Sequence, residues 1–330
     1  MNWKIKAHSL AVLSRLPAGR QMYHWLQRCA GTNKLQVERD LGRAYELVEM
    51  IHESGRFIEG AECLEIGTGW HPFVPMVLSL AGAKRVTTID VNPWLTEAYV
   101  RATWSSLRDH IPEIAARCGL PEIEIRHRYG AGSKASTGLQ EFLKRLRIEY
   151  RYPGDARVTG FPKDSVDVVV SSNVLEHIPR ELQVEIHAET RRILRPGGVA
   201  AHRFNPQDHF ATVDKTITHA NFLQYTSEEW HWYGGSGLAY HNRLRAPDYR
   251  NLFEAAGLKL EVCRERIDQR SLKAIESGDL KIADEFAVYS PEELAVDYMW
   301  IVCRKKTVTG GVAHETPMEP AHRETEESLV

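Results

Sequence analysis

The sequence predicts an α/β fold built on one seven-stranded sheet, parallel over residues 61–205, with helices on both faces. Two observations predict it. Short apolar segments alternate with helical ones from residue 61 to about residue 205, which is the pattern of strand–helix–strand units. The first of these segments runs into a turn with two glycines, Gly67 and Gly69, and such turns join a strand to a helix around a ligand.

The strands are expected where apolar, β-branched runs are bounded by turn residues. Helical stretches follow the first, second and fourth of these strands, including "PRELQVEIHAETRRIL" at 179–194, and another is expected at 246–257. The seven predicted strands are 61–66, 84–90, 147–152, 165–172, 198–204, 258–266 and 296–305.

The segment before the sheet is predicted to be helical. In "VERDLGRAYELVEMIHESG" the apolar residues recur at helical spacing, and Gly55 ends the pattern. The residues expected to face the core are Leu41, Tyr45, Leu47, Val48 and Ile51.

The chain is therefore divided into five parts. Residues 1–60 are expected to form an N-terminal helical cap, and residues 61–205 the main part of the sheet. Residues 206–245 break the alternation and are rich in aromatic residues, histidine and glycine, so they are interpreted as an inserted lid. Residues 246–306 complete the sheet. The tail, 307–330, is too polar to build a core and is expected to be disordered.

Composition limits the partners. The net charge is −2 and 26% of residues are charged, so no basic field favours nucleic acid. No apolar run reaches the length of about 20 residues that a membrane helix needs. The five cysteines follow no metal-clip or redox spacing, so no metal site is expected, and a reducing cytoplasm is the expected compartment.

The glycine turn "LEIGTGWHP" departs from the dinucleotide fingerprint. Trp70 and His71 follow Gly69, and the third glycine, which lets the helix pack on the strand in NAD-binding proteins, is missing. Asp90 ends the second strand, 21 residues after Gly69, where a carboxylate can accept from both hydroxyls of a ribose. The pattern predicts a ligand with a ribose that need not carry a pyrophosphate.

Three further stretches agree with such a ligand. "YPGDA" follows the third strand and places Asp155 where an adenine amino group is read. "NVLEHI" follows the fourth strand and begins at Asn173. "LRPGG" leads into the fifth strand.

With Glu-x-Gly-x-Gly at Glu65, these motifs resemble class I S-adenosylmethionine (SAM)-dependent methyltransferases over residues 61–205 and 258–305. The resemblance implies a Rossmann-like class I methyltransferase sheet and SAM as cofactor. It places Glu65, Gly67 and Gly69 at the methionine arm, Asp90 at the ribose, Asp155 and Ala156 at the adenine, and Asn173 beside the sulfonium. Trp70 is a departure, and its side chain is predicted to cover part of the cofactor.

Candidates for catalysis are expected after the fifth strand and in the lid. His209 is the best placed base among His202, His209, His219, His231 and His241, and Asn173 and Tyr240 are the other predicted catalytic residues. His177 is interpreted as a helix-start residue, and Trp94 and Trp104 as packing residues.

The lid is predicted to close on its "GGSG" stretch together with helices around Tyr23 and Trp25. Its aromatic side chains, Trp230, Trp232, Tyr233 and Tyr240, then either face the sulfonium or form a hydrophobic cover.

Three functions stay open at this point. The first is methyl transfer from SAM to a small molecule of secondary metabolism or polysaccharide biosynthesis. The second is cyclisation of SAM to azetidine-2-carboxylate with release of methylthioadenosine, as in the azetidine-2-carboxylate synthases that the layout also resembles. The third is SAM binding without turnover. The oligomeric state is left open.

Overall fold

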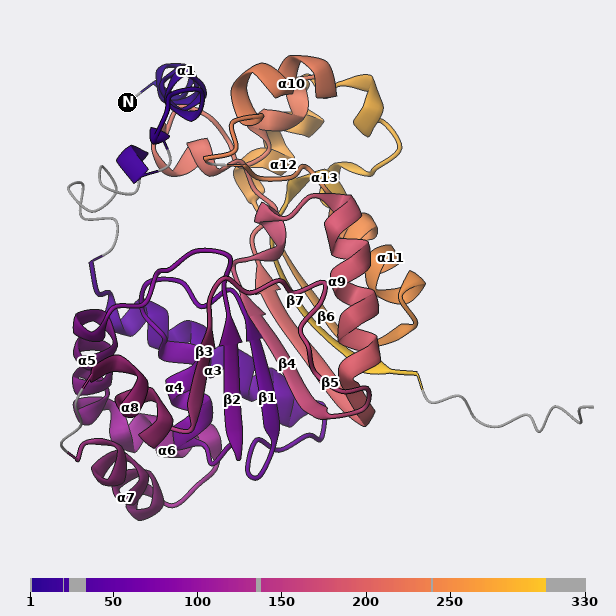
Figure 1. Ribbon diagram of the computed structural model, residues 1–330. Coiled ribbons are helices and arrows are strands. Elements are labelled where there is room, and N and C mark those ends of the chain that lie inside the picture. The colour runs from indigo at the N-terminus through magenta and orange to yellow at the C-terminus, as the bar shows by residue number, and fades with distance from the viewer. Residues whose placement is uncertain (1, 20, 24–33, 135–137, 239, 307–330) are drawn as a thin grey trace, which may run out of the picture.

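The computed structural model describes residues 2–19, 21–23, 34–134, 138–238 and 240–306 (Figure 1). The predicted disordered tail and Trp25 lie outside the described residues. None of the described helices combines the length and the apolarity that crossing a bilayer requires.

One sheet contains all seven predicted strands, in the order β3-β2-β1-β4-β5-β7-β6. Strands β1 to β5 pair in parallel, whereas β7 lies antiparallel between β5 and β6. The parallel pairing predicted from the alternation over residues 61–205 is confirmed for β1 to β5, whereas no direction was predicted for the last two strands. The strands are β1 (Glu62–Ile66), β2 (Arg85–Ile89), β3 (Ile148–Arg151), β4 (Val166–Ser172), β5 (Leu194–Phe204), β6 (Leu258–Ile267) and β7 (Val296–Lys305).

Successive strand residues point to opposite faces, and each face has its own apolar cluster. Val168 and Val170 join the cluster formed with α3 to α8, whereas Val169 between them joins the cluster formed with α9 and α11. The helices on the first face are α3 (Val37–Glu53), α4 (Phe73–Leu80), α5 (Glu97–Ser106), α6 (Ile111–Cys118), α7 (Glu122–Gly132) and α8 (Gly138–Arg145); those on the second are α9 (Arg180–Ile193) and α11 (Ala246–Ala255).

Helix α3 confirms the helix predicted before the sheet. All five residues expected to face the core are buried, and Gly55 follows the helix with a φ of 73°. The long helix α9 ends at Ile193, and β5 begins at Leu194, four residues earlier than predicted, because Leu194 already pairs with Val166 of β4.

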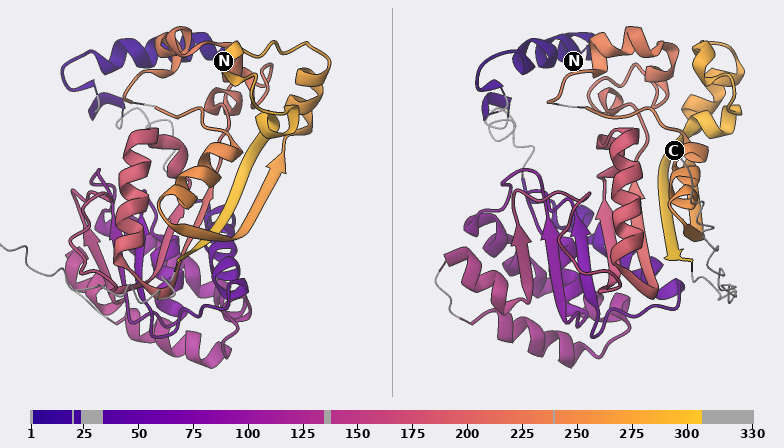
Figure 2. Two further views of the ribbon diagram at one scale, coloured as in Figure 1. Left: turned by 90° about the vertical axis from the view of Figure 1, so that its right-hand side faces the viewer. Right: turned by 45° about the vertical axis from the view of Figure 1, so that its right-hand side comes forward.

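A smaller group of helices and loops lies beyond one end of the sheet (Figures 1 and 2). It combines three segments that are far apart in the chain: α1 (Trp3–Ser14), residues 206–245 with α10 (Ser227–Gly234), and residues 268–295 with α12 (Gln269–Glu276) and α13 (Pro291–Ala295). From here on, "the cap" means these three segments together and not the N-terminal helical cap predicted for residues 1–60. The remaining described residues are called the body.

Aromatic side chains form the core of the cap. Trp3 of α1 packs on Phe210, Trp230 and Tyr233, and its backbone N–H donates to Asp214 Oδ2 at 3.0 Å. The two long helices of residues 1–60 thus pack in different places, α1 in the cap and α3 on the sheet. Residues 268–295 were predicted to belong to the part that completes the sheet, 246–306, but apolar residues among them pack with α1 and α10 instead.

Candidate cofactor and acceptor site

A cavity of about 980 Å³ opens at the carboxyl ends of β1, β2 and β4. Ligands of open α/β sheets bind at such ends. All eight residues predicted to contact the cofactor line this cavity: Glu65, Gly67, Gly69, Trp70, Asp90, Asp155, Ala156 and Asn173. Their individual contacts with the cofactor stay a prediction.

The glycine turn is fixed by close contacts. Gly67 has a φ of 85°, and a Cβ at this position would lie 2.4 Å from Cγ2 of Val174, so no other residue fits without displacement. Gly69 also has a positive φ, 66°, and its N–H donates to Asp90 Oδ2 at 3.1 Å. The turn and the acid of the second strand are therefore one unit.

Asp90 faces the cavity as a preorganised acceptor. Its Oδ1 accepts from the Asn92 N–H at 2.9 Å, and only 9% of the residue is exposed. Burial raises the pKa of Asp90, while the hydrogen bonds from Asn92 and Gly69 oppose that rise. The Trp94 side chain and the Thr68 backbone also donate to this carboxylate, and its contact with a ribose stays a prediction.

Glu65 lies deeper, at the end of β1. Burial raises its pKa to about 8, although Thr88 Oγ1 donates to its Oε2 at 2.5 Å. Glu65 is therefore mostly protonated at neutral pH, and its hydroxyl is a donor as well as an acceptor.

Two tryptophans form one wall of the cavity. The ring centroids of Trp70 and Trp94 lie 4.3 Å apart, and both residues line the cavity. The interpretation of Trp94 as a packing residue missed this role, because the loop after β2 brings it back over the glycine turn. Trp104 is a packing residue, stacked on Tyr129 at 4.9 Å.

Asp155 stands at a more open part of the lining. Arg157 Nη2 lies 2.7 Å from its Oδ2, and this contact lowers the pKa of Asp155. The residue is therefore a charged acceptor for an amino group, in competition with Arg157.

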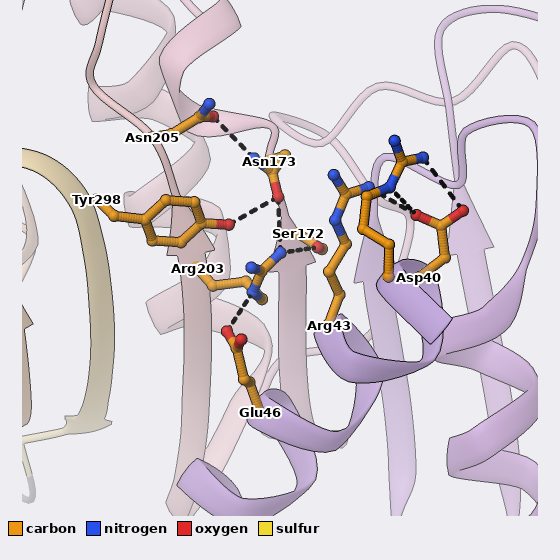
Figure 3. A network of polar contacts seen from close by, with 9 residues as sticks. Asp40, Arg43, Glu46, Ser172, Asn173, Arg203, Asn205 and Tyr298 are labelled. Carbon is orange, nitrogen blue, oxygen red and sulfur yellow. Dashed lines mark hydrogen bonds and ion pairs between the residues drawn. The ribbon is translucent and has the colours of Figure 1, made fainter. Parts of the chain in front are cut away.

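Asn173 is the centre of a polar network (Figure 3). It adopts a φ of 56°, in the left-handed region that asparagine tolerates better than most residues. Its Oδ1 accepts from Arg203 Nη1 at 2.7 Å and from the Tyr298 hydroxyl at 2.9 Å, and its Nδ2 donates to Asn205 Oδ1 at 2.7 Å. Three neighbours thus fix the orientation of this amide at the cavity wall.

The first turns of α3 supply cations that the sequence analysis missed. Arg39 and Arg43 both donate to Asp40, from Nε at 2.9 Å and from Nη1 at 3.0 Å, and all three residues line the cavity. Two guanidinium groups share one carboxylate, so this wall carries a surplus positive charge that suits a carboxylate of the ligand. The spacing i, i+4 on a helix was the available signal.

His209 does not line the cavity, but His177, whose ring lies beside that of His209, does. The rings of His209 and His177 lie 4.8 Å apart, and His177 belongs to the lining. His177 Nδ1 lies 2.9 Å from the carbonyl oxygen of Tyr240, so Tyr240 contributes its backbone here and its side chain is not in the lining. The interpretation of His177 as a helix-start residue missed its place at the cavity.

Glu176 completes a cluster with the two histidines. One ligand atom each of Glu176, His177 and His209 lie within 4.8 Å of one another. Burial raises the pKa of Glu176 and lowers that of His209 well below the usual range. We call these three residues the histidine cluster.

The other predicted histidines do not line the cavity. His202 is buried beside Ser171, and burial lowers its pKa to about 3. His219 bonds Asp297 at 3.0 Å, and His241 stacks on His209 at 5.0 Å. His231 lies on α10 and is exposed.

The aromatic residues of the predicted lid do not line the cavity. Trp230 and Tyr233 pack within the cap, and 66% of Trp232 is exposed to solvent. These side chains were expected either to face the sulfonium or to form a hydrophobic cover. Trp230 and Tyr233 form part of an apolar core and do not line the cavity. Trp70 and Trp94 take the place at the cavity instead.

Comparison with known proteins decides the family. A model of the methyltransferase-domain family matches residues 36–261, more than half of the 330 residues. The chain belongs to this family. SAM is the methyl donor that membership of this family implies. The contacts of Asp90, the glycine turn and the paired arginines with SAM stay a prediction.

Curated relatives match only a short stretch. Uncharacterized methyltransferases of Mycobacterium avium and Mycobacterium marinum are 55% identical over 40 residues, which is 12% of this chain and 15% of theirs.

Solved structures also match the chain, at low sequence identity. A SAM-dependent methyltransferase of Mesorhizobium loti is 13% identical, with a TM-score of 0.41 over 78% of this chain and 96% of its own. Magnesium protoporphyrin IX methyltransferase of Synechocystis, solved with bound SAH, is 13% identical, with a TM-score of 0.44 over 81% of this chain and 83% of its own. The [4+2]-cyclase SpnF is 15% identical, with a TM-score of 0.42 over 79% of this chain and 81% of its own.

Proposed function

We propose that this methyltransferase transfers the methyl group of SAM to a hydroxyl group of a small molecule, bound between Asn173 and the histidine cluster. The observation that carries the proposal is the continuity of the lining. Asn173, Val174 and His177 follow one another along the cavity wall, so a molecule beside His177 shares the space in which SAM binds. The acceptor class that we propose is a small molecule of secondary metabolism or polysaccharide biosynthesis, modified in the cytoplasm.

The chemical step is a direct displacement. The acceptor oxygen attacks the methyl carbon, the new C–O bond forms as the C–S bond breaks, and the electron pair of that bond stays on sulfur as S-adenosylhomocysteine. The protein has to align the three atoms and exclude water. We assign the alignment to Asn173, whose amide is held by Arg203, Tyr298 and Asn205.

The hydroxyl proton must leave for this step, because a neutral hydroxyl is a poor nucleophile. We assign the activation of this hydroxyl to the histidine cluster. The lowered pKa of His209 keeps its ring neutral, with a lone pair on one nitrogen. Tyr240 supports the cluster through the carbonyl oxygen that orients His177.

Mass spectrometry of the products tests the proposal. Incubation with SAM alone is expected to leave SAM intact, and S-adenosylhomocysteine is expected only when fractions of hydroxylated small molecules are added. Methylthioadenosine and azetidine-2-carboxylate from SAM alone would replace methyl transfer by intramolecular cyclisation. SAM binding without either product in any fraction would favour a binding protein. The Asp90→Ala variant is the matched control. It loses the predicted ribose contact and keeps the histidine cluster intact, so it should form less S-adenosylhomocysteine because it binds SAM more weakly.

A further inference from the structure

The histidine cluster contains two buried polar atoms that have no hydrogen-bond partner among the described residues. Glu176 Oε2 and His209 Nε2 are shielded from solvent and have no hydrogen-bond partner among the described residues. Glu176 as a whole is only 1% exposed. Buried polar atoms without partners cost free energy, and a bound ion or an ordered water satisfies such atoms in folded proteins.

In both imidazole rings the backbone holds Nδ1, which leaves the lone pair on Nε2. The carbonyl oxygen of Tyr240 can only accept, so His177 Nδ1 carries the proton and His177 Nε2 keeps its lone pair. The ring of His209 bonds the backbone of Asn205, and because its Nε2 has no partner, this bond uses Nδ1. A ring nitrogen held by a carbonyl, with the other nitrogen free, is the usual arrangement of a metal-binding histidine.

The geometry points to a metal site: we propose that Glu176, His177 and His209 bind one divalent first-row transition metal ion, such as Zn²⁺ or Co²⁺, at the edge of the SAM cavity. Two imidazoles and one carboxylate suit these ions better than Mg²⁺ or Ca²⁺. The ligand atoms lie within 4.8 Å of one another. Ligands bound at about 2.0–2.2 Å to one tetrahedral ion lie about 3.5 Å apart, so small side-chain rotations close the site.

Three protein ligands leave an open position, and His177 places that position at the cavity. A hydroxyl bound there loses its proton near neutral pH, because the metal lowers the hydroxyl's pKa. The proton passes to water, and the oxygen keeps the electron pair that attacks the methyl carbon. His209 then acts as a metal ligand and not as the base itself. This role rests on the proposed methyl transfer, whereas the metal site does not.

The probe is Co²⁺ alone. The protein carries no affinity tag and is first dialysed against a chelator, and Co²⁺ is then added. The expected result is one Co²⁺ per chain with a visible absorption band, displaced by Zn²⁺ and not by Mg²⁺. Glu176→Gln and His209→Gln each remove one ligand with little change in volume. Each is expected to weaken Co²⁺ binding by more than about tenfold, at least as much as the loss of a group that merely supports a ligand.

His219→Gln is the matched control. His219 belongs to a second group of possible ligands with Asp268 and Asp297, but Asp297 there already bonds both Arg266 and His219. This variant is expected to bind Co²⁺ like the wild type. Absence of Co²⁺ binding at millimolar concentration, equal binding by all variants, or loss of binding only in His219→Gln would each overturn the proposal.

Further measurements distinguish a loss of metal binding from a loss of folding and from a loss of methyl transfer. Thermal unfolding without metal shows whether the buried-site variants fold, and His177→Gln, at an exposed ring, repeats the test if they do not. Calorimetry with SAM is expected to give the same affinity with and without Co²⁺. Co²⁺ binding without methyl transfer to any acceptor contradicts the proposed function and leaves the metal site standing. Methyl transfer at full rate in the chelator-treated protein contradicts the catalytic role of the metal.

Discussion

The body and the cap are built by different means. The body has two aliphatic clusters on the faces of a sheet, and its strands supply residues to both. The cap has a core rich in aromatic rings, and it also buries polar groups such as Arg245 and Asp208, which are 1% and 0% exposed. Within the described residues the cavity lining comes from the body alone. The histidine cluster lies between them, with Glu176 and His177 in the body and His209 in the cap.

This difference predicts that SAM binding and turnover reside in separable parts. The body holds the predicted SAM contacts without the cap, whereas the cluster is complete only when the cap is in place. Damage to the cap should therefore reduce turnover and spare SAM affinity. Damage to the carboxyl ends of the strands should reduce both.

The largest expected effect is on the core of the cap. Phe222 is fully buried there, and Phe222→Ala should destabilise the cap by about 3–5 kcal/mol through lost contacts and an internal void. Hydrogen exchange should speed up in α1, α10 and α12, turnover should fall, and SAM affinity by calorimetry should stay unchanged.

Phe253→Ala is the matched change in the body, at an equally buried phenylalanine of α11. It should speed exchange in the sheet instead. Equal losses of SAM affinity in the two variants would show that the regions are not separable.

The second effect concerns acid stability of the body. Burial lowers the pKa of His187 and of His202 to about 3, below the value of 6.5 in the unfolded chain. Between these values the folded state binds fewer protons, so stability falls as the pH falls from 6.5. Each histidine should contribute about 1.4 kcal/mol per pH unit.

Urea unfolding between pH 7 and pH 5 measures this slope. Neither ring nitrogen of His187 has a hydrogen-bond partner among the described residues, so His187→Leu removes its share of the slope without breaking a bond. His8→Leu, at an exposed histidine of the cap, is the control and should leave the slope as it is. An unchanged slope in His187→Leu would mean that water reaches this ring.

The third effect concerns the cofactor side. Asp90→Ala should weaken SAM binding by about 1.5–3 kcal/mol, the loss typical of hydrogen bonds to a charged group. Asp155→Ala should cost less, because Asp155 is more exposed and already pairs with Arg157. Calorimetry in folded variants decides, and an unchanged affinity in Asp90→Ala would remove Asp90 from the site.

The smallest effect is expected at Trp232. Its side chain is exposed and lies outside the cavity lining, so Trp232→Leu should change stability by less than about 0.5 kcal/mol. SAM affinity and turnover should also stay the same. A clear loss of turnover would show that the cap changes its position when substrates bind, which would restore the predicted aromatic cover.

Residues at the ends of parallel strands were predictable because the sheet itself brings them together. Gly67, Asp90 and Asn173 each follow a strand that the alternation of apolar residues identifies, and parallel strands end at one edge. The sequence also identified helix α3 from its spacing. These features depend on local pattern, which a single chain displays.

Contacts between distant segments were not predictable in this way. Glu176 and His209 meet because the cap returns to the body, and nothing in "NVLEHI" or "NPQDHF" indicates the other. Arg43 is one of many charged residues of α3 until the fold turns it toward the cavity. The reversed direction of β7 and the union of residues 268–295 with α1 follow from packing that spans most of the chain.

The position of Trp3 has a consequence for the order of folding during synthesis. Its backbone N–H bonds Asp214, 211 residues further along the chain. At about 5–20 residues per second, a ribosome needs about 10–40 s to make that stretch. Helix α1 is therefore made well before the residues that cover it, and its apolar side stays uncovered for that interval.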